Sequence, residues 1–404
     1  MNDTLIQIIS EETMPNLLAA MALKPQKVIH LCTPLMRRAS RALHLAYKQS
    51  SLSLDFSEVN LSSHPGLGEM NQIVRDVIKE NSNPILNFTG GTKLMSIGAY
   101  AAASMAKIAS VYVDTATGEF VNGLSGGDFM SLFPQGSQIN SVSRQLTVNG
   151  IAVANGVERV STGKKWTEYV ELADLLLRDL AVECKCHNWA DQLVKKEPRD
   201  YSQCQKYFKE LYGKLISLPD GVADAAVRSG LFEYCDGGVC FAQSWVKKLL
   251  SLDFENRKYP SYVIFEAINA ARWPISFFHG NWWEVAVMRY LDESGRFRDL
   301  RWSVNAGSRG SDSTDMEEDI LGVEGVNLLY VSCKRGGDKS KLSRVIEDVN
   351  SSARRIGGRF AKKILAVFFE LKGQQGSRLQ NRCGSLGIDL LDRETVATIQ
   401  PWTE

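Results

Sequence analysis

The first 145 residues alternate between two hydrophobic periods. Short apolar runs that are typical of strands occupy residues 5–10, 27–33, 51–60, 83–91 and 108–120. Apolar residues at the three- and four-residue spacing of helices occupy residues 14–23, 35–49, 68–81 and 92–107. This strand–helix alternation predicts a mostly parallel, Rossmann-like α/β sheet that is covered by helices on both faces.

The pattern changes at about residue 146 and again at about residue 262. Residues 166–181 and 201–216 have helical spacing, and residues 222–245 suggest a helix, a glycine stop and two short strands around Asp236–Gly238. A hairpin after a helix is compatible with a small winged-helix unit. We also interpret the Gly-Lys-Lys stretch at 163–165 as a surface connection. The predicted middle region spans residues 146–262.

A third block, residues 263–404, contains both strand-like and helix-like hydrophobic patterns. A helix at 279–293 is followed by charged loops that are rich in glycine and serine. Strands are expected at 317–325, 327–334, 362–371 and 388–392, and helices at 342–358 and 377–387. This order predicts a mixed sheet flanked by helices. The expected domains are therefore 1–145, 146–262 and 263–404.

Composition limits the class of protein. The 47 basic and 46 acidic residues give a net charge of +1, so a coat that binds DNA non-specifically is excluded and any nucleic-acid site must be local. No uncharged run is long enough to span a bilayer, and no secretory signal is visible, so we expect a cytoplasmic protein. Its eight cysteines should then be free thiols. A zinc site around Cys184, Cys186 and His187 is the less favoured alternative, because the usual paired spacing is lacking.

The stretch Asn87–Lys93 connects a predicted strand to the predicted helix that follows it. Glycines at 90 and 91 let backbone N–H groups approach a ligand, and the helix N-terminus favours an anion. Thr89 and Thr92 add hydroxyl groups and Lys93 adds a cation. The spacing of a Walker A loop is absent. The stretch is therefore either a nucleotide cradle or a tight turn with a helix cap.

Position favours the ligand-binding interpretation. Ligands of open α/β sheets bind beyond the carboxyl ends of the strands. The first predicted strand ends at Ser10–Asn16 and the second at Thr33. These loops and the glycine turn are expected to share one crevice.

The residues from Ile8 to Asn16, the strand KVIHLCT, the turn NFTGGTKLMSIGA and the run VYVDTATG together resemble the CARF domain of CRISPR ancillary proteins. The resemblance implies a cyclic oligoadenylate ligand, with cyclic tetra-adenylate the expected ring, lying across a two-fold dimer interface. It therefore also implies a homodimer. The implied ligand contacts are Ser10, Thr13, Met14, Asn16, Thr33, Thr89, Gly90, Gly91, Thr92 and Lys93.

The last block carries a second chemical signal. Glu317-Glu318-Asp319 begins one strand, and Ser332-Cys333-Lys334 ends the next, which resembles PD-(D/E)XK nucleases. Phosphodiester hydrolysis needs a hard divalent cation, Mg²⁺ or Mn²⁺, which binds carboxylates, lowers the pKa of the attacking water and polarises the phosphate. A lysine beside it can orient that water or neutralise developing charge.

Ser332 departs from this pattern, because the family places its second carboxylate there. Glu284, on the helix at 279–293, matches a helical glutamate of this superfamily, and Glu317 shares a strand face with Asp319. The implied catalytic residues are Glu284, Glu317, Asp319, Ser332 and Lys334, and the implied metal ligands are Asp319, Glu284 and Cys333. Loss of activity is the alternative, and a solvated acidic turn is the simplest explanation of the motif taken alone.

Basic residues follow this motif at 335, 339, 341, 344, 354, 355, 359, 362 and 363, and they suit a phosphate backbone or a solubilising face. The combined resemblance implies a nuclease of CRISPR defence that cyclic oligoadenylate activates to cut DNA, with RNA as a further candidate substrate. A ligand-responsive regulator that binds nucleic acid without cutting is the main alternative, and a sensor domain that hydrolyses its own ligand is a third. Trp282 and Trp283 are expected to pack the helix rather than stack on bases.

Overall fold

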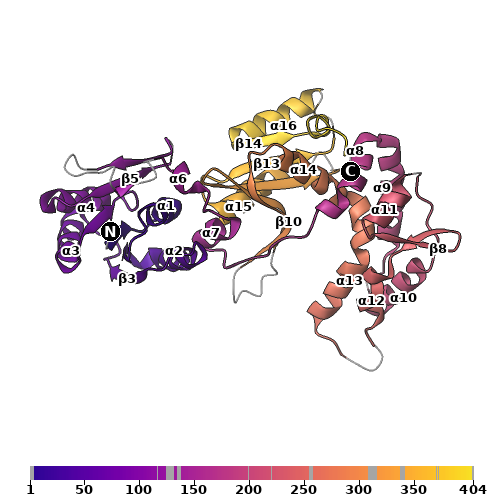
Figure 1. Ribbon diagram of the computed structural model, residues 1–404, viewed down its shortest axis with the longest axis horizontal. Helices are drawn as coiled ribbons and strands as arrows, with labels where there is room; N and C mark the ends of the chain where they lie inside the picture. The colour runs from indigo at the N-terminus through magenta and orange to yellow at the C-terminus, as the bar shows by residue number, and fades with distance from the viewer. Residues whose placement is uncertain are drawn as a thin grey trace.

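The computed structural model describes residues 4–402 apart from 116, 124–131, 134–137, 199, 220, 254–257, 308–315, 337–341, 370 and 372. Two six-stranded sheets and a two-stranded hairpin form its frame. Figure 1 shows that the C-terminal sheet lies between the N-terminal domain and the helical middle region, so order in space differs from order in sequence. No described helix is both long and apolar enough to cross a bilayer.

The N-terminal sheet has the strand order β3-β2-β1-β4-β5-β6. Its first five strands are parallel, and β6 is antiparallel to β5. This confirms the predicted Rossmann-like α/β fold. The strands are β1 (Thr4–Ile8), β2 (Lys27–Cys32), β3 (Asp55–Asn60), β4 (Pro84–Asn87), β5 (Ser110–Asp114) and β6 (Glu119–Asn122). The helices are α1 (Met14–Leu23), η1 (Pro34–Met36), α2 (Arg37–Gln49), α3 (Leu67–Glu80) and α4 (Lys93–Ala106).

Successive side chains of the buried strands point to opposite faces of the sheet and pack into two separate hydrophobic cores. Leu5 packs with Leu17 of α1 and Leu43 of α2 on one face, while Ile6 packs with Met70 of α3 on the other. Each face is therefore closed by its own pair of helices, as the alternation along a strand requires.

The middle region contains helices and the expected hairpin. The short helix α6 (Asn140–Ser143) lies just before this region. The elements of the region are α7 (Val148–Ala154), β7 (Arg159–Val160), η2 (Thr167–Tyr169), α8 (Val170–Arg178), α9 (Leu180–Lys196), α10 (Tyr201–Tyr212), α11 (Val222–Arg228), β8 (Phe232–Cys235), β9 (Gly238–Phe241) and α12 (Gln243–Leu250). The hairpin β8–β9 follows α11 directly, as predicted. The comparison with a winged helix stays a prediction, as do the domain boundaries.

The C-terminal sheet has the order β14-β13-β12-β11-β10-β7. The strand β11 is antiparallel to both of its neighbours, β10 and β12, whereas β12, β13 and β14 are parallel. Its strands are β10 (Arg298–Gly307), β11 (Met316–Glu324), β12 (Asn327–Lys334), β13 (Lys362–Val367) and β14 (Ile388–Leu391), and its helices are α13 (Ser261–Ser276), the π-helix η3 (Phe277–Asn281), α14 (Trp282–Glu293), α15 (Leu342–Gly357), α16 (Gly373–Ser385) and α17 (Arg393–Val396).

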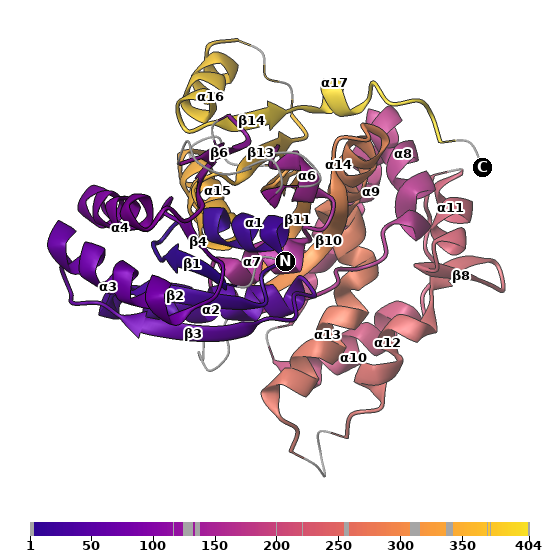
Figure 2. The same ribbon diagram turned by 60° about the vertical axis from the view of Figure 1, so that its left-hand side comes forward.

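One expectation for this region was wrong. Residues 298–307 were expected to be charged loop, but they form the ten-residue strand β10. Pairing with β11 on one side and β7 on the other overrides their polar composition. The strand β7 comes from the predicted middle region, so that region supplies an edge of the C-terminal sheet. The backbone N–H of Val148, at the start of α7, donates to the Asp299 carboxylate of β10 at 2.7 Å, and Figure 2 shows α7 beside α2 of the N-terminal domain.

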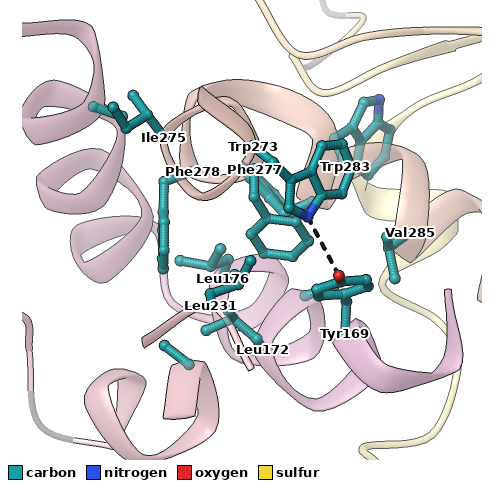
Figure 3. Packing of buried hydrophobic residues seen from close by; sticks show 14 of the residues in the cluster. Tyr169, Leu172, Leu176, Leu231, Trp273, Ile275, Phe277, Phe278, Trp283 and Val285 are labelled. Carbon is teal, nitrogen blue, oxygen red and sulfur yellow. Dashed lines mark hydrogen bonds between the residues drawn. The ribbon is translucent and has the colours of Figure 1, made fainter. Parts of the chain in front are cut away.

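An aromatic core joins the helical region to this sheet. Figure 3 shows Trp273, Phe277 and Tyr169 converging, with the Trp273 Nε1–H donating to the Tyr169 hydroxyl at 3.3 Å. Trp282 and Trp283 are fully buried, which confirms that they pack the helix and do not present their rings to bases. This core fixes α14, and with it the position of Glu284.

Candidate functional site

Two loops of the N-terminal domain meet where the strand order reverses. The strand β1 pairs with β2 on one side and β4 on the other, so its carboxyl end marks the switch point where open α/β sheets bind ligands. Ser10 Oγ lies 3.4 Å from the place that a Cβ atom on Gly90 would take. The structure thus brings the two predicted loops together. We call the surface that residues 9–13 and 88–93 form together the sensor crevice.

The glycines of the turn are required by close packing. A Cβ atom on Gly90 would lie 2.1 Å from the carbonyl oxygen of Ile8, a distance that no side chain tolerates. Gly91 has φ +83°, the left-handed conformation that glycine adopts at least cost. The backbone of the turn therefore presses against the end of β1, where only glycine fits.

The threonines of the turn hold its shape. Thr89 Oγ1 donates to Asn87 Oδ1 at 2.7 Å and accepts from the backbone N–H of Val113 at 2.7 Å, so this hydroxyl ties β4 to β5. Thr92 caps α4, with its Oγ1 accepting from the N–H of Met95 at 3.4 Å. Gly91, Thr92 and Lys93 are exposed at the surface of the turn. A ligand would meet these three, whereas Thr89 is already engaged.

The loop after β1 buries polar atoms that lack partners. Within the described part of the chain, the hydroxyl of Thr13 and Oδ1 of Asn16 are buried without a hydrogen bond. The Nδ2 group of Asn16 donates a hydrogen bond to the Ile8 carbonyl oxygen at 3.1 Å. Met14 packs in the core, and Thr33 lies one strand away at the end of β2. Unpaired buried polar atoms are uncommon, and they suit a site that awaits a polar ligand.

The second site is centred on Asp319 of β11. Its Oδ2 accepts from the Cys333 backbone N–H at 2.6 Å, from Ser332 Oγ at 3.1 Å and from Lys334 Nζ at 3.5 Å. Three consecutive residues at the end of β12 thus converge on one carboxylate oxygen. The sequence placed the acid and the lysine on neighbouring strands, and the antiparallel β11–β12 pair brings them into contact.

Glu284 approaches this centre from α14. Its Oε2 accepts from the Trp302 Nε1–H at 2.8 Å. Burial raises the pKa of Glu284 well above its usual value, and the nearby charges of Asp319 and Glu317 raise it further, against the opposing effects of the Trp302 hydrogen bond and Lys334. The three carboxylates Glu284, Glu317 and Asp319 form what we call the carboxylate cluster.

Lys334 stays charged beside the cluster. Burial by itself lowers the pKa of Lys334, but the charge of Asp319 and its hydrogen bond to the lysine outweigh that effect and hold the pKa above its usual value. A permanently protonated lysine stabilises negative charge and does not act as a base. Its place next to Asp319 suits the neutralisation of charge on a reacting phosphate.

The residues that hold two of the carboxylates were missed by sequence reasoning. Trp302 binds Glu284, and the hydroxyl of the next residue, Ser303, donates to Glu317. Neighbours in a strand normally face opposite sides, but Ser303 has φ +52°, and this left-handed turn lets both side chains reach the cluster. Such backbone strain is concentrated at functional sites. Nothing in the local sequence indicated it, because residues 298–307 were expected to be loop.

A divalent cation fits the donor set. Among the described residues, no group of three or more His, Cys, Asp or Glu side chains is arranged to hold a metal ion. Mg²⁺, however, is usually held by one or two carboxylates together with water and substrate phosphates. Two carboxylates that repel each other, Glu284 and Asp319, meet that requirement, because a cation relieves their repulsion. Assignment of Mg²⁺ or Mn²⁺ to them stays a proposal.

Cys333 is a weaker ligand than the sequence suggested. Burial raises the pKa of its thiol well above the usual value, and Asp319 and Glu284 raise it further, so the thiol keeps its proton. A protonated sulfur is a poor ligand for a hard cation. All eight cysteines are free thiols.

The predicted basic segment is divided by the fold. Arg355 pairs with the buried carboxylate of Glu318, and Arg354, Arg355 and Arg359 line a pocket of about 460 Å³ against the loop after β1. Lys339 and Lys341 lie outside the described residues. The segment is therefore not one continuous basic face.

Comparisons with known proteins bear on the N-terminal domain and on the fold. Residues 4–146 match the model of the Card1 CARF domain. The chain is similar in structure to Can2 from Sulfobacillus thermosulfidooxidans in complex with cyclic tetra-adenylate, with 19% identity, a TM-score of 0.64 and coverage of 98% of this chain and 97% of that chain. It is also similar to protein VC1899 from Vibrio cholerae, with 15% identity, a TM-score of 0.67 and coverage of 98% and 95%.

A third similar structure is a type III CRISPR defence DNA nuclease activated by cyclic oligoadenylate. The identity is 16% and the TM-score 0.51, over 91% of this chain and 45% of that chain. A comparison with curated protein sequences gave no significant match. At these identities, the likeness to all three structures shows a shared fold.

Proposed function

Since residues 4–146 of this chain form a CARF domain, we propose that the protein is a cytoplasmic, metal-dependent nuclease of CRISPR defence that a cyclic oligoadenylate activates. The observation that carries the nuclease part is the convergence of Ser332, Cys333 and Lys334 on one oxygen of Asp319, with Glu284 facing it from α14. The expected substrate is DNA, and RNA is a further candidate.

Ligand binding is supported by the sensor crevice. Its backbone turn, exposed Lys93 and unpaired Thr13 hydroxyl suit the phosphates and hydroxyls of a cyclic oligoadenylate. Can2, whose fold this chain shares, was solved with cyclic tetra-adenylate, and that ring is the activator we propose. The proposed contacts are Ser10, Thr13, Gly90, Gly91, Thr92 and Lys93, with Met14, Asn16, Thr33 and Thr89 supporting the loops.

A homodimer is supported by the surface beside the crevice. Leu94 and Ile97 of α4 are 56% and 53% exposed, directly after Lys93. Apolar side chains exposed at a ligand site suggest that a second copy covers them. A ring with two-fold symmetry would then sit between two equivalent turns.

The nuclease chemistry follows from the charges at the second site. Asp319 and Glu284 would hold a divalent cation, which lowers the pKa of a bound water and polarises the phosphate. Lys334 would face the reacting phosphate, where its charge balances the negative charge that develops as the P–O bond breaks. Ser332 cannot replace the missing carboxylate as a ligand, but its hydroxyl orients Asp319.

A pocket between the two sites offers a route of activation. It is lined by Glu11, Glu12 and Thr13 of the sensor loop and by Arg354 and Arg359 of the C-terminal domain. Burial raises the pKa of Glu12, whereas the charges of Arg359 and Arg354 and a hydrogen bond from the Arg359 backbone N–H lower it. A ligand that shifts this loop would change a charged contact with α15. The ligand can activate the nuclease only if it binds the active conformation more tightly than the inactive one, and a changed contact with α15 would provide that difference.

The alternative is a regulator that binds nucleic acid and does not cut. Ser332 in place of a carboxylate favours it, since a serine hydroxyl is a poorer ligand for a divalent cation, and among the described residues no group of three or more His, Cys, Asp or Glu side chains is arranged to hold one. In this case the sensor assignment stands and the C-terminal domain is a scaffold.

The test incubates the full chain with supercoiled plasmid, single-stranded DNA or single-stranded RNA. Each substrate is given Mg²⁺ or Mn²⁺, with and without cyclic tetra-adenylate, and Asp319→Ala and Lys334→Ala serve as variants. We expect cutting only with ligand and metal together, and none by either variant. Cutting by both variants at the wild-type rate would refute the assigned site. Ligand binding without cutting of any substrate would establish the regulator instead.

A further inference from the structure

The segment before the first helix of the middle region runs along the edge of the nuclease-like sheet. The strand β7 pairs with the end of β10, and the pairing continues: Ser161 N–H donates to the Asn305 carbonyl at 2.9 Å, and Lys164 N–H donates to the Trp302 carbonyl at 2.8 Å. The Gly-Lys-Lys stretch is therefore not a free surface connection. It follows the edge of the sheet and reaches the carboxylate cluster through an isolated antiparallel bridge between Lys164 and Trp302.

Lys164 reaches the cluster from this edge. Its Nζ lies 3.4 Å from Glu317 Oε1 and 4.2 Å from the centre of the Trp273 ring. Trp273 packs on Trp302, whose ring centre is 5.5 Å away and whose Nε1–H binds Glu284. The ammonium group is thus held over the aromatic pair that positions one carboxylate and beside a second carboxylate.

Gly163 makes this approach feasible. It has φ +81°, and a Cβ atom there would lie 2.7 Å from the Trp302 carbonyl oxygen. A larger residue would push the segment away from β10 and break the Lys164–Trp302 hydrogen bond. The backbone is therefore shaped to bring a lysine to this point.

The charge of Lys164 is available to a ligand. Its side chain is 47% exposed and that of Glu317 is 58% exposed, and ion pairs at such exposure contribute little to stability. A phosphate oxygen could therefore replace or share the Glu317 contact at small cost. The neighbouring Lys165 is 84% exposed and interacts with Glu168, away from the cluster.

From this arrangement we infer that Lys164 binds a backbone phosphate of the nucleic-acid substrate, next to the phosphate that Lys334 would face. The inference rests on the proposed function. Lys334 contacts Asp319 and Lys164 contacts Glu317, and these two acids are two residues apart on β11, about 7 Å along the strand. The two lysines therefore flank the carboxylate cluster and would contact different phosphates of one strand.

The test measures binding of the full chain to a fluorescein-labelled duplex and to its single strand by anisotropy. Chelator is present, so that no cleavage occurs, and salt is varied. Lys164→Ala should weaken binding severalfold, and it should reduce the slope of log K against log salt by about 0.9 on duplex DNA or about 0.7 on the single strand. Lys164→Arg should retain the slope. Lys165→Ala is the matched control and should behave as wild type.

The outcomes separate this inference from the proposed function. If wild type binds and cuts, and Lys164→Ala keeps the wild-type slope and affinity, Lys164 is only a partner of Glu317 and the inference is overturned. If Lys164→Ala and Lys164→Arg both lose affinity together with melting temperature, the lysine has a structural role. If wild type binds neither probe and cuts no substrate, the proposed function fails and the inference fails with it.

Discussion

Arg355 Nη2 lies 2.6 Å from Glu318 Oε1, and Glu318 stands directly before Asp319 in β11. The same carboxylate accepts from the Tyr330 hydroxyl at 2.8 Å, and Glu318 is only 3% exposed. Because side chains alternate along a strand, Glu318 faces α15 while Asp319 faces the carboxylate cluster. The helix that lines the interdomain pocket is thereby tied to the strand that carries the central acid.

Breaking this pair should destabilise the C-terminal domain. Arg355→Met leaves a buried carboxylate with one partner fewer, and we expect the free energy of unfolding to fall by about 1–3 kcal/mol. The combination with Glu318→Gln should recover part of the loss, with a coupling energy above about 0.5 kcal/mol in a double-mutant cycle by urea denaturation. Arg344→Met, at an exposed position on the same helix, is the control. Purely additive effects would show that the two side chains do not interact.

Glu12 should restrain the nuclease when no ligand is bound. Glu12→Gln removes the charge that faces Arg359 and Arg354 across the pocket, and so weakens a contact between the sensor loop and α15. We expect ligand-free plasmid cutting to rise at least about fivefold, the lower end of typical coupling free energies. Glu11→Gln, a change of the same size at an exposed neighbour, should have a smaller effect. Equal basal rates in wild type and Glu12→Gln would remove the pocket from the route of activation.

Trp302 should matter for metal affinity more than for folding. Trp302→Phe keeps an aromatic ring in the core but removes the N–H that holds Glu284. Loss of such a supporting hydrogen bond typically lowers metal affinity or activity about 10–100-fold. The Mn²⁺ affinity of wild type and of Trp302→Phe can be measured by calorimetry and from the Mn²⁺ concentration that cutting requires. Trp283→Phe is the matched control, since it loses a buried hydrogen bond to the Ala366 carbonyl and none to a carboxylate. The prediction is wrong if both variants bind Mn²⁺ equally.

His30 should make the N-terminal domain sensitive to acid. It is fully buried between Ser40 and Tyr47, and burial, with a smaller effect of His44, lowers the pKa of His30 to about 3. The unfolded chain takes up this proton near pH 6.5, so stability falls as pH drops from there toward 3. The loss should be about 2 kcal/mol at pH 5.

Denaturation curves of the full chain between pH 7 and pH 4.5 measure this effect. His30→Gln should be less stable at pH 7, because it disturbs a buried network, but its stability should change less with pH. His64→Gln, in an exposed loop, should keep the wild-type slope. Parallel pH profiles for wild type and His30→Gln would assign the acid sensitivity to other groups.

Local features of the chain were sufficient for most of the fold and for the centres of both sites. The alternation of apolar runs predicted the first sheet, since buried parallel strands leave short, uninterrupted apolar stretches. Gly90 and Gly91 predicted a turn with room for close backbone contacts. In the structure, the backbone at Gly90 packs directly against the Ile8 carbonyl oxygen. Asp319 and Lys334 were paired correctly, because two strands joined by a tight turn must lie side by side.

What the sequence could not determine depends on contacts between segments that are far apart in the chain. Lys164 and Glu317 are 153 residues apart, and β10 became a strand because β7 and β11 pair with it. The left-handed Ser303 has no local signature, since the surrounding sheet imposes its conformation. Periodicity and turn chemistry are properties of neighbouring residues, so the sequence alone determined most of the elements and their order, β10 excepted. The positions of Trp302 and Lys164 around the carboxylates arise from packing among distant segments, which only the tertiary structure decided.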